Sequence, residues 1–325
     1  MTHKQSNNNI NKESKDTDRT DRNNDGKTKE VTTKKFSNLQ VLYTNADQFL
    51  NKMEDLKTFI SGDEPDIIII TEVIPKAQAN PIDAPLLEID GYKPHVNFDI
   101  SKTNLGAFGI RGVAIYVRDD LTVNEIILSS EFKDQLWLEI YLTEQKSLLC
   151  GCIYRSPTKE KEATLRSTTQ VCDILSKAAE RKHTHLLICG DFNYREIHWE
   201  NKSIDENSGY LSTFVNTIQD CFLYQHVTEP TRYRHGEEPS LLDLILSNGE
   251  GMVHNLEYHP GLGDSDHVTL TFDLICYKEH KKELQSKPDF FKADFNAIKQ
   301  KLVDINWEES CAVPLTKVIV FSLTN

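Results

Sequence analysis

The amino-acid sequence predicts an α/β fold, and three observations carry that prediction. Near the N-terminus a strand, a helix and a second strand follow one another over residues 39–71. Short apolar segments between residues 109 and 154 have the spacing and turn residues of an antiparallel meander. A long helical segment then leads into the apolar run 186–189, so alternating units flank the meander.

The first unit consists of strands at Leu39–Thr44 and Asp66–Thr71 with a helix between them. The apolar residues of that helix recur at helical spacing, at Phe49, Met53, Leu56, Phe59 and Ile60. Pro65 separates the helix from the second strand, which is apolar enough to be covered on both faces. The strands end at Asn45 and Glu72, and ligands gather at the carboxyl ends of such strands.

The middle of the chain is expected to hold a surface loop region followed by the meander. Residues 74–102 contain four prolines, which favour loops. The meander strands are expected at residues 109–117, 121–128, 136–142 and 148–154. The last of them ends in the polar turn Tyr154–Pro157.

The second alternating unit contains a helix at 163–181 and the strand 186–189, which Gly190 ends. Asp191 and Asn193 follow two residues apart, and residues at that spacing point the same way in an extended segment. One carboxylate and one amide therefore face one spot, where a hydrolytic site could use the carboxylate to activate or coordinate a water and the amide to donate to a phosphoryl oxygen. A polar turn is the alternative interpretation, because Gly, Asp and Asn are common turn residues.

The rest of the fold is expected to contain a helix at 210–218, a strand at 241–247 and a last strand at 268–275. Asp243 stands in the middle of its strand, flanked by leucine and isoleucine, so its carboxylate would be buried and would need a partner. His267 is a suitable partner, because a carboxylate fixes the tautomer of an imidazole and stabilises its charged form.

Composition divides the chain into three segments. Residues 1–37 are rich in Asn, Lys, Asp, Thr and Ser, lack periodic apolar residues and are expected to be a disordered polar tail. Residues 38–276 are expected to form one large domain. Residues 277–325 begin with a charged stretch and continue into a short amphipathic helix. The apolar positions of that helix are Phe291, Phe295, Ile298, Leu302 and Ile305.

Hydropathy and cysteine content argue against a membrane-spanning protein, a zinc-binding protein and a disulfide-rich protein, and the net charge limits how the chain could contact DNA. The chain has a net charge of -13 and no apolar run that approaches the about 20 residues of a membrane span. Seven scattered cysteines without a Cys-x-x-Cys pair indicate neither a zinc site nor a disulfide framework, so a reducing intracellular compartment fits best. The acidic balance means that any contact with DNA requires a local basic patch or bound metal ions.

Six short motifs stand in the order found in the endonuclease/exonuclease/phosphatase superfamily, which the chain resembles over about residues 39–275. They are Asn45, Thr71-Glu72, Tyr154-Arg155-Ser156-Pro157, Gly190-Asp191-Phe192-Asn193, Leu242-Asp243 and Ser265-Asp266-His267. Segments Pro65–Glu72, Gly112–Val117 and Tyr154–Pro157 resemble in particular the apurinic-endonuclease-like endonuclease domain of non-LTR (LINE-type) retrotransposons. The resemblance implies a four-layered α/β sandwich, in which two mixed sheets lie face to face with helices outside.

The resemblance also implies the catalytic residues of a metal-dependent phosphodiester hydrolase. Asp191 would orient or deprotonate the attacking water. Asn193 and Tyr154 would hold the scissile phosphate. Asp243 and His267 would form a dyad beside that phosphate.

The metal implied by the resemblance is Mg²⁺, with Mn²⁺ as a substitute. Glu72 would be the main metal ligand, Asn45 would lie close to the metal or the phosphate, and Asp266 would be a further acid at the site. This set agrees with the preference of Mg²⁺ for few carboxylates, water and phosphate oxygens.

Substrate contacts are expected from residues beside the motifs. Thr231 and Ser265 match positions that hold the phosphate or order the site. Arg155 and Arg232 directly follow motif positions and are the preferred DNA contacts, with ordinary surface charge as the alternative. Further basic residues near the mouth of the site are Arg111, Arg195 and Arg234.

The implied function is a nick in one strand of target DNA that leaves a 3′ hydroxyl to prime reverse transcription. Residues 289–307 resemble the linker before a reverse transcriptase, and the chain ends without that domain. We expect a protein that is intracellular, is monomeric as an isolated domain and does not bind membranes, and that has access to the nucleus if it acts on genomic DNA. The alternatives are a phosphatase or sphingomyelinase of the same superfamily, or a non-catalytic remnant of a retroelement.

Overall fold

The computed structural model describes residues 36–76, 78–101, 110–143, 145–199, 203–204, 209–279 and 295–303. The chain divides into two units, Met1–Glu279 and His280–Asn325. Within the second unit, helix α4 (Phe295–Val303) occupies the position of the short helix expected there. Most of the expected polar tail, residues 1–35, lies outside the described residues.

The first sheet has six strands in the order β13-β14-β1-β2-β4-β3. These strands are β1 (Phe36–Asn45), β2 (Ile67–Thr71), β3 (Tyr92–Val96), β4 (Val113–Arg118), β13 (Val253–His259) and β14 (Thr269–Glu279). Strands β1 and β2 are parallel and are connected through helix α1 (Met53–Ile60), whereas the other pairs are antiparallel. The expected strand, helix, strand unit is therefore present, and the sheet is mixed.

The second sheet also has six strands, in the order β11-β12-β8-β7-β6-β5. These are β5 (Thr122–Glu125), β6 (Gln135–Thr143), β7 (Lys146–Tyr154), β8 (His185–Asp191), β11 (Tyr224–Gln225) and β12 (Asp243–Ser247). Strands β7 and β8 are parallel and flank helix α2 (Lys161–Glu180), which gives a second unit of the same kind. The remaining elements are α3 (Gly209–Asp220), a two-stranded sheet of β9 (Ile197–His198) and β10 (Ser203–Ile204), and the 3-10 turns Phe49–Asn51, Ala84–Leu87 and Glu250–Met252.

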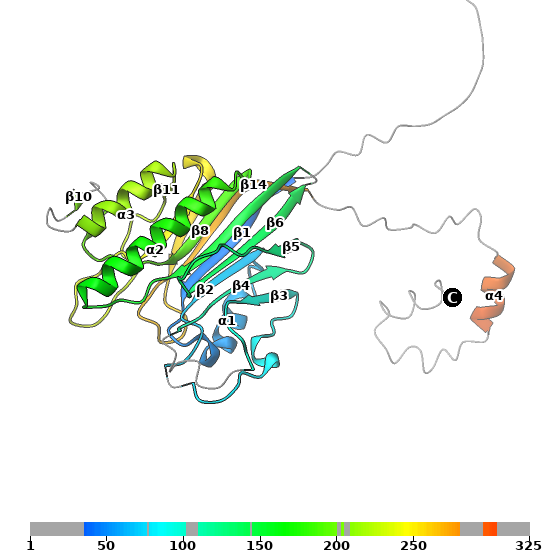
Figure 1. Cartoon of the computed structure of the whole chain (residues 1–325). Coiled ribbons are helices and arrows are strands. Elements are labelled where there is room, and N and C mark those ends of the chain that lie inside the picture. Colours follow the sequence, from blue (N-terminus) through cyan, green and yellow to red (C-terminus); the bar gives the residue numbers. More distant parts are fainter. Residues whose placement is uncertain are drawn as a thin grey trace, which may run out of the picture. The chain divides into compact units, whose positions relative to one another are not determined.

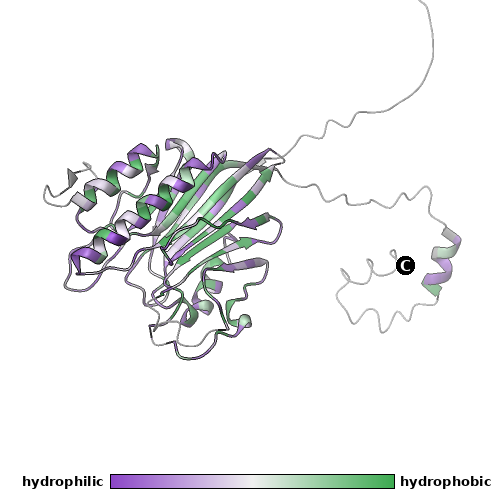
Figure 2. Ribbon diagram, in the orientation of Figure 1, coloured by the Kyte–Doolittle hydropathy of each residue, from purple (hydrophilic) through white to green (hydrophobic). Residues whose placement is uncertain are grey.

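Three apolar clusters hold the layers together. In β2, Ile67 and Ile69 point into the cluster between the two sheets, whereas Ile68 and Ile70 pack with α1 on the outer face. Helices α2 and α3 lie side by side and cover the outer face of the second sheet (Figure 1). The strands are mainly hydrophobic, and the helices carry both hydrophobic and hydrophilic residues (Figure 2). This arrangement confirms the predicted α/β sandwich with two mixed sheets.

Three expectations about individual elements were wrong. Residues 92–96 form strand β3 inside the expected loop region, and Pro94 is tolerated because β3 is an edge strand. The expected four-strand meander is divided, since β4 pairs with β2 in the first sheet and only β5, β6 and β7 form a meander. Strand β12 begins at Asp243, so this acid stands at the end of a strand and not in its middle.

The described cysteines are free thiols, and five of the six are buried. No described helix has the length and apolar character needed to cross a membrane.

Gly190 allows β7 and β8 to approach each other beside the site. A Cβ at this position would lie 2.0 Å from the carbonyl oxygen of Ile153 on β7. We expect Gly190→Ala to lower the free energy of unfolding by about 2–3 kcal/mol or more, because backbone must move. Gly209→Ala is the control, since a Cβ there meets nothing within 4 Å. Urea unfolding measures both, and equal stability of the two variants would contradict the steric reason.

His226 makes stability depend on pH. Burial lowers the pKa of this imidazole from 6.5 to about 4, and one ring nitrogen lies 2.7 Å from Ser247 Oγ. Because the unfolded chain takes up the proton first, stability is complete above pH about 6.5 and is lost as the pH falls toward 4. We expect the wild type to lose about 1 kcal/mol more than His226→Gln between pH 7 and pH 5, allowing for partial exposure. The same substitution at exposed His254 is the control for denaturant titrations at both pH values.

Candidate active site

The polar strand ends converge because of strand register. Asn45 at the end of β1 is paired with Thr71, which directly precedes Glu72. In the other sheet Tyr154 at the end of β7 is paired with Asp191 at the end of β8, and Asp191 is paired with Asp243. Because β12 is antiparallel to β8, its first residue reaches the same edge as the last residues of its neighbours.

Asp243 and His267 form the dyad that the sequence predicts. Nδ1 of His267 lies 2.7 Å from Oδ2 of Asp243, and both side chains are almost completely buried. The hydroxyl of Tyr43 donates to the other oxygen, Oδ1, at 2.5 Å. The backbone amide of Asp243 donates to Thr231 Oγ1 at 3.0 Å. Every oxygen of this buried carboxylate therefore has a donor.

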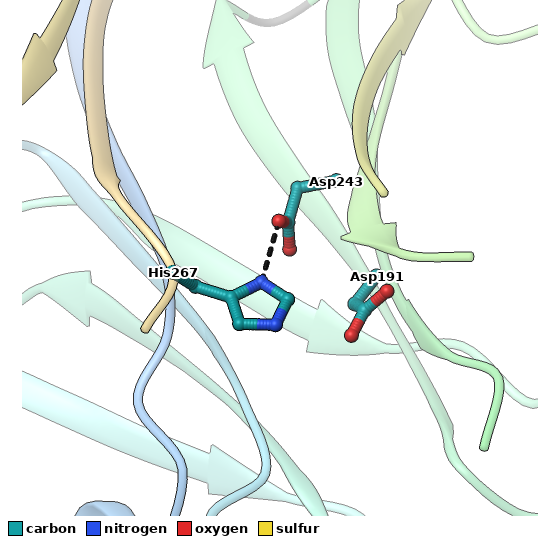
Figure 3. A group of neighbouring side chains, drawn as sticks. All are labelled: Asp191, Asp243 and His267. Carbon is teal, nitrogen blue, oxygen red and sulfur yellow. Dashed lines mark hydrogen bonds and ion pairs between the residues drawn. The ribbon is translucent and has the colours of Figure 1, made fainter. Parts of the chain in front are cut away.

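The imidazole of His267 lies beside two carboxylates, those of Asp243 and Asp191 (Figure 3). Burial lowers the pKa of His267, but the charge and hydrogen bond of Asp243 and the charge of Asp191 outweigh burial and raise the pKa to about 9. The ring is therefore an imidazolium at neutral pH, and its Nδ1 proton is directed to Asp243. The other ring nitrogen, Nε2, makes no hydrogen bond to Asp243.

Asp191 is the second buried carboxylate of the site. Its Oδ2 accepts from Asn45 Nδ2 at 2.9 Å, and its Oδ1 accepts from the backbone amide of Asn193 at 3.1 Å. Burial and the charges of Asp243 and Glu72 raise the pKa of Asp191 well above its usual value, against the opposing effect of His267. A carboxylate with raised proton affinity, fixed in one orientation, is suited to accept a proton.

Glu72 directly follows β2, and Asn193 stands two residues after the end of β8. Both residues have a left-handed backbone, with φ of 56° and 53°. Asparagine tolerates this conformation, whereas glutamate adopts it at a cost of about 1 kcal/mol or more. Glu72 Oε1 accepts from Asn45 Nδ2 at 3.1 Å, and Oε2 pairs with Arg111 Nη2 at 2.5 Å. Arg111 also reaches Asp47, so a guanidinium balances two acids at this edge.

Two sets of residues could hold a metal ion. One ligand atom each of Asp191, Asp243 and His267 lie within 4.8 Å of one another. However, Mg²⁺ prefers oxygen ligands to imidazole nitrogen, so the set that contains His267 suits this ion less well. Glu72, with Asp191 near it, offers carboxylate oxygens that fit a hard divalent cation better.

Asp266 is held by two arginines. Its Oδ2 lies 3.1 Å from Arg232 Nε and 2.9 Å from Arg234 Nε, and its Oδ1 lies 3.8 Å from His267 Nε2. Arg232 and Arg195 also pair with Glu237. The predicted substrate contact Arg232 is therefore part of a network of arginines and acids at the rim.

Tyr154 and Asn193 both line the cavity over the site. Burial and the charges of Glu72 and Asp191 raise the pKa of Tyr154 well above its usual value, so the phenol is neutral and can donate. Asn193 donates its side-chain amide to the backbone carbonyl of Arg155 at 2.9 Å.

Thr231 and Ser265 are directed to backbone groups of the site. Thr231 Oγ1 accepts from the amides of Leu242 and Asp243, and Ser265 Oγ donates to the carbonyl of Asn45 at 2.7 Å. Thr231 is completely buried. These contacts fix the backbone at Asn45, Leu242 and Asp243.

A cavity of about 840 Å³ opens over these residues. The predicted site residues that line it are Glu72, Tyr154, Arg155, Asp191, Asn193, Arg232, Asp266 and His267. Those outside its lining are Asn45, Thr231, Asp243 and Ser265. The structure thus places eight of the predicted residues on the cavity wall and the others directly behind them.

Tyr43 is the site residue that sequence reasoning missed. It stands two residues before Asn45 in β1, so alternation along the strand places both side chains on one face. That spacing could have identified Tyr43 as a buried polar neighbour. Its partner Asp243 could not be identified in this way, because it is 200 residues further along the chain.

One family of known proteins matches part of this chain. Residues 148–271 match the model of the family described as endonuclease-reverse transcriptase. No match was found among curated protein sequences. The matched segment contains Tyr154, Asp191, Asn193, Asp243 and His267.

Solved structures with the same fold are similar to this chain at low identity. The endonuclease domain of TRAS1, a telomere-specific non-LTR retrotransposon, is 17% identical and covers 74% of this chain and 99% of its own, with a TM-score of 0.52. The AP endonuclease LMAP from Leishmania major is 14% identical and covers 75% and 88%, with a TM-score of 0.55. The catalytic domain of Xenopus laevis APE2 is 16% identical and covers 75% and 94%, with a TM-score of 0.55.

The fold and the family match together confirm the resemblance to the endonuclease/exonuclease/phosphatase superfamily. The family match extends over residues 148–271, and the solved structures share the fold of this chain.

Proposed function

We propose that the chain is a Mg²⁺-dependent DNA endonuclease that nicks one strand of target DNA and leaves a 3′ hydroxyl for retrotransposition. The observation that carries the proposal is the buried Asp191 beside the His267–Asp243 pair, at the wall of a cavity with arginines around it. The family match of residues 148–271 and the fold shared with the TRAS1 endonuclease domain support the retroelement type. Action on genomic DNA would require access to the nucleus.

Asp191 would accept the proton of the attacking water. Its two oxygens are oriented by Asn45 and the amide of Asn193, and its raised pKa favours proton uptake. The water oxygen would form a bond to phosphorus while the bond from phosphorus to the 3′ oxygen breaks, and the 3′ oxygen would take up a proton from solvent water. The products would be a 5′ phosphate and a 3′ hydroxyl.

Tyr154, Asn193 and the imidazolium of His267 would hold the phosphate oxygens through charge-assisted or neutral hydrogen bonds. Asp243 keeps the ring of His267 in one orientation, and Tyr43 and Thr231 hold Asp243. Bound Mg²⁺, with Glu72 as its main ligand and Asn45 and Asp266 near it, would neutralise the charge that develops on the phosphate and the leaving oxygen.

The test is nicking of supercoiled plasmid by purified protein with Mg²⁺, with and without EDTA. We expect nicking that EDTA abolishes and that is lost in both Asp191→Ala and His267→Ala. Asp220→Ala, an exposed acid at the end of α3, is the control and should nick as the wild type does. Nicking that survives in both site variants would refute the assignment of the site.

Two other outcomes point to the alternative functions. Hydrolysis of an inositol phosphate or sphingomyelin, but not of DNA, would identify a phosphatase or sphingomyelinase. Folded protein that hydrolyses none of these substrates would identify a non-catalytic remnant.

A further inference from the structure

Arg155 directly follows β7 at the wall of the cavity, yet its side chain is turned into the protein. The residue is 3% exposed. Its Nη1 donates to the backbone carbonyls of Phe192 and Asn193, each at 3.1 Å, and its Nε donates to Ser167 Oγ at 3.2 Å. The guanidinium is thus bonded to the turn after β8 and to helix α2.

The backbone of Arg155 is bonded to the same turn. Its amide donates to the carbonyl of Asp191 at 2.9 Å, and its carbonyl accepts from the side-chain amide of Asn193 at 2.9 Å. Asn193 has the left-handed φ of 53°, which needs support from surrounding structure. Arg155 therefore holds Asn193 from both its backbone carbonyl and its side chain.

A ring contact completes the enclosure of the guanidinium. Its central carbon lies 4.2 Å from the ring centre of Tyr194, and the hydroxyl of Tyr194 donates to Thr168 Oγ1 on α2 at 2.9 Å. Ring stacking and carbonyl acceptors satisfy a planar guanidinium in a way that an ammonium cannot reproduce. By contrast, Arg195 and Arg234 at the rim have half-exposed side chains that can approach a DNA backbone.

We propose that Arg155 is a positioning residue, which fixes the Asp191–Asn193 turn in its catalytic geometry and does not contact the phosphates of DNA. This inference rests on the proposed nuclease function. It replaces the interpretation of Arg155 as a preferred DNA contact, because its Nε and Nη1 donate to protein acceptors and the side chain is almost completely buried. The consequence is that removing Arg155 should slow catalysis without weakening DNA binding.

The experiment compares wild type, Arg155→Lys, Arg155→Gln and Arg195→Gln. Arg181→Gln is the matched control, because Arg181 is an exposed arginine at the far end of α2. Three quantities are measured: the single-turnover nicking rate at saturating plasmid, the affinity for a 20-base-pair duplex across a salt series, and hydrogen exchange of the peptide that contains residues 190–194.

For Arg155→Lys and Arg155→Gln we expect the nicking rate to fall about 100-fold, as misplacement of catalytic groups by about 1 Å can cause. We expect DNA affinity and its salt dependence to stay as in the wild type, and exchange in residues 190–194 to become faster. Arg195→Gln should instead lower the slope of log affinity against log salt by about 0.9, the effect of one lost phosphate contact.

Two results would overturn the inference. One is a wild-type nicking rate in Arg155→Lys, since a phosphate contact tolerates any positive charge. The other is a slope lowered by about 0.9 in Arg155→Gln, as for a lost phosphate contact. If neither variant folds, Ser167→Ala removes one acceptor of Arg155, and it should lower the rate and speed exchange to a smaller extent; no change in either would refute the proposal.

The inference and the proposed function can fail separately. If the wild type cuts no DNA, the nuclease function falls, and hydrogen exchange of residues 190–194 still tests whether Arg155 holds the turn. If the wild type nicks DNA and the Arg155 variants exchange and cut as it does, only the positioning role is refuted.

Discussion

Replacing Asp191 with asparagine is expected to lower the nicking rate by about 10³- to 10⁴-fold, the upper part of the range that a general base contributes. An amide cannot accept the proton of the attacking water, yet it has almost the shape of the carboxylate. The amide can accept from only one of the two donors that Asp191 now satisfies, Asn45 Nδ2 and the amide of Asn193. The fold should survive, because the change also removes one of two buried acids that face each other across β8 and β12, which offsets the lost hydrogen bond. DNA affinity should not fall, since a negative charge in the cavity is lost.

Single-turnover nicking, duplex binding and thermal unfolding measure these three effects. The control is Asp220→Asn, the same chemical change at an exposed position on α3. A rate within about tenfold of the wild type would show that another group accepts the proton. A large loss of stability would show instead that Asp191 supports the fold.

Replacing Asp243 with asparagine is expected to have the second largest effect, a loss of about 10³-fold in rate together with about 3 kcal/mol of stability. The amide can accept from only one of the two donors that Asp243 now satisfies, the Tyr43 hydroxyl and His267 Nδ1. The imidazolium of His267 also loses the counter-charge that raises its pKa. Both the orientation and the charge of the ring at the phosphate are therefore disturbed.

Urea unfolding and the nicking rate separate the two parts of this prediction. Tyr43→Phe serves as the graded comparison, because it removes one donor to Asp243 and leaves the bond to His267 intact. We expect a smaller loss of rate in Tyr43→Phe than in Asp243→Asn. Equal activity of Asp243→Asn and wild type would exclude a role for the dyad.

Several features of the site lower the stability of the folded protein. Asp191 and Asp243 are cross-strand partners, and like charges in that relation are destabilising. Glu72 adds a left-handed backbone conformation that glutamate does not favour. Asn45, Tyr43 and His267 offset part of this energy through hydrogen bonds to the two aspartates.

Much of the fold could be predicted because its patterns are local. The alternation of Ile67–Ile70 between two apolar layers and the helical spacing from Met53 to Ile60 are properties of short segments. Strand β3 escaped prediction because it is half-exposed and contains Pro94, which usually indicates a loop. Strand β13 escaped because its residues are mostly exposed or partly exposed polar side chains.

The sequence by itself determined which polar residues end the strands, since the change from an apolar run to Asn45, Glu72, Tyr154 or Asp191 is visible in neighbouring residues. Only the tertiary structure decided what each side chain contacts. Tyr43 meets Asp243 across two sheets, and the guanidinium of Arg155 turns inward to the turn after β8. The physical reason is that such contacts depend on strand order, register and the packing of one sheet on the other, which join residues far apart in the chain.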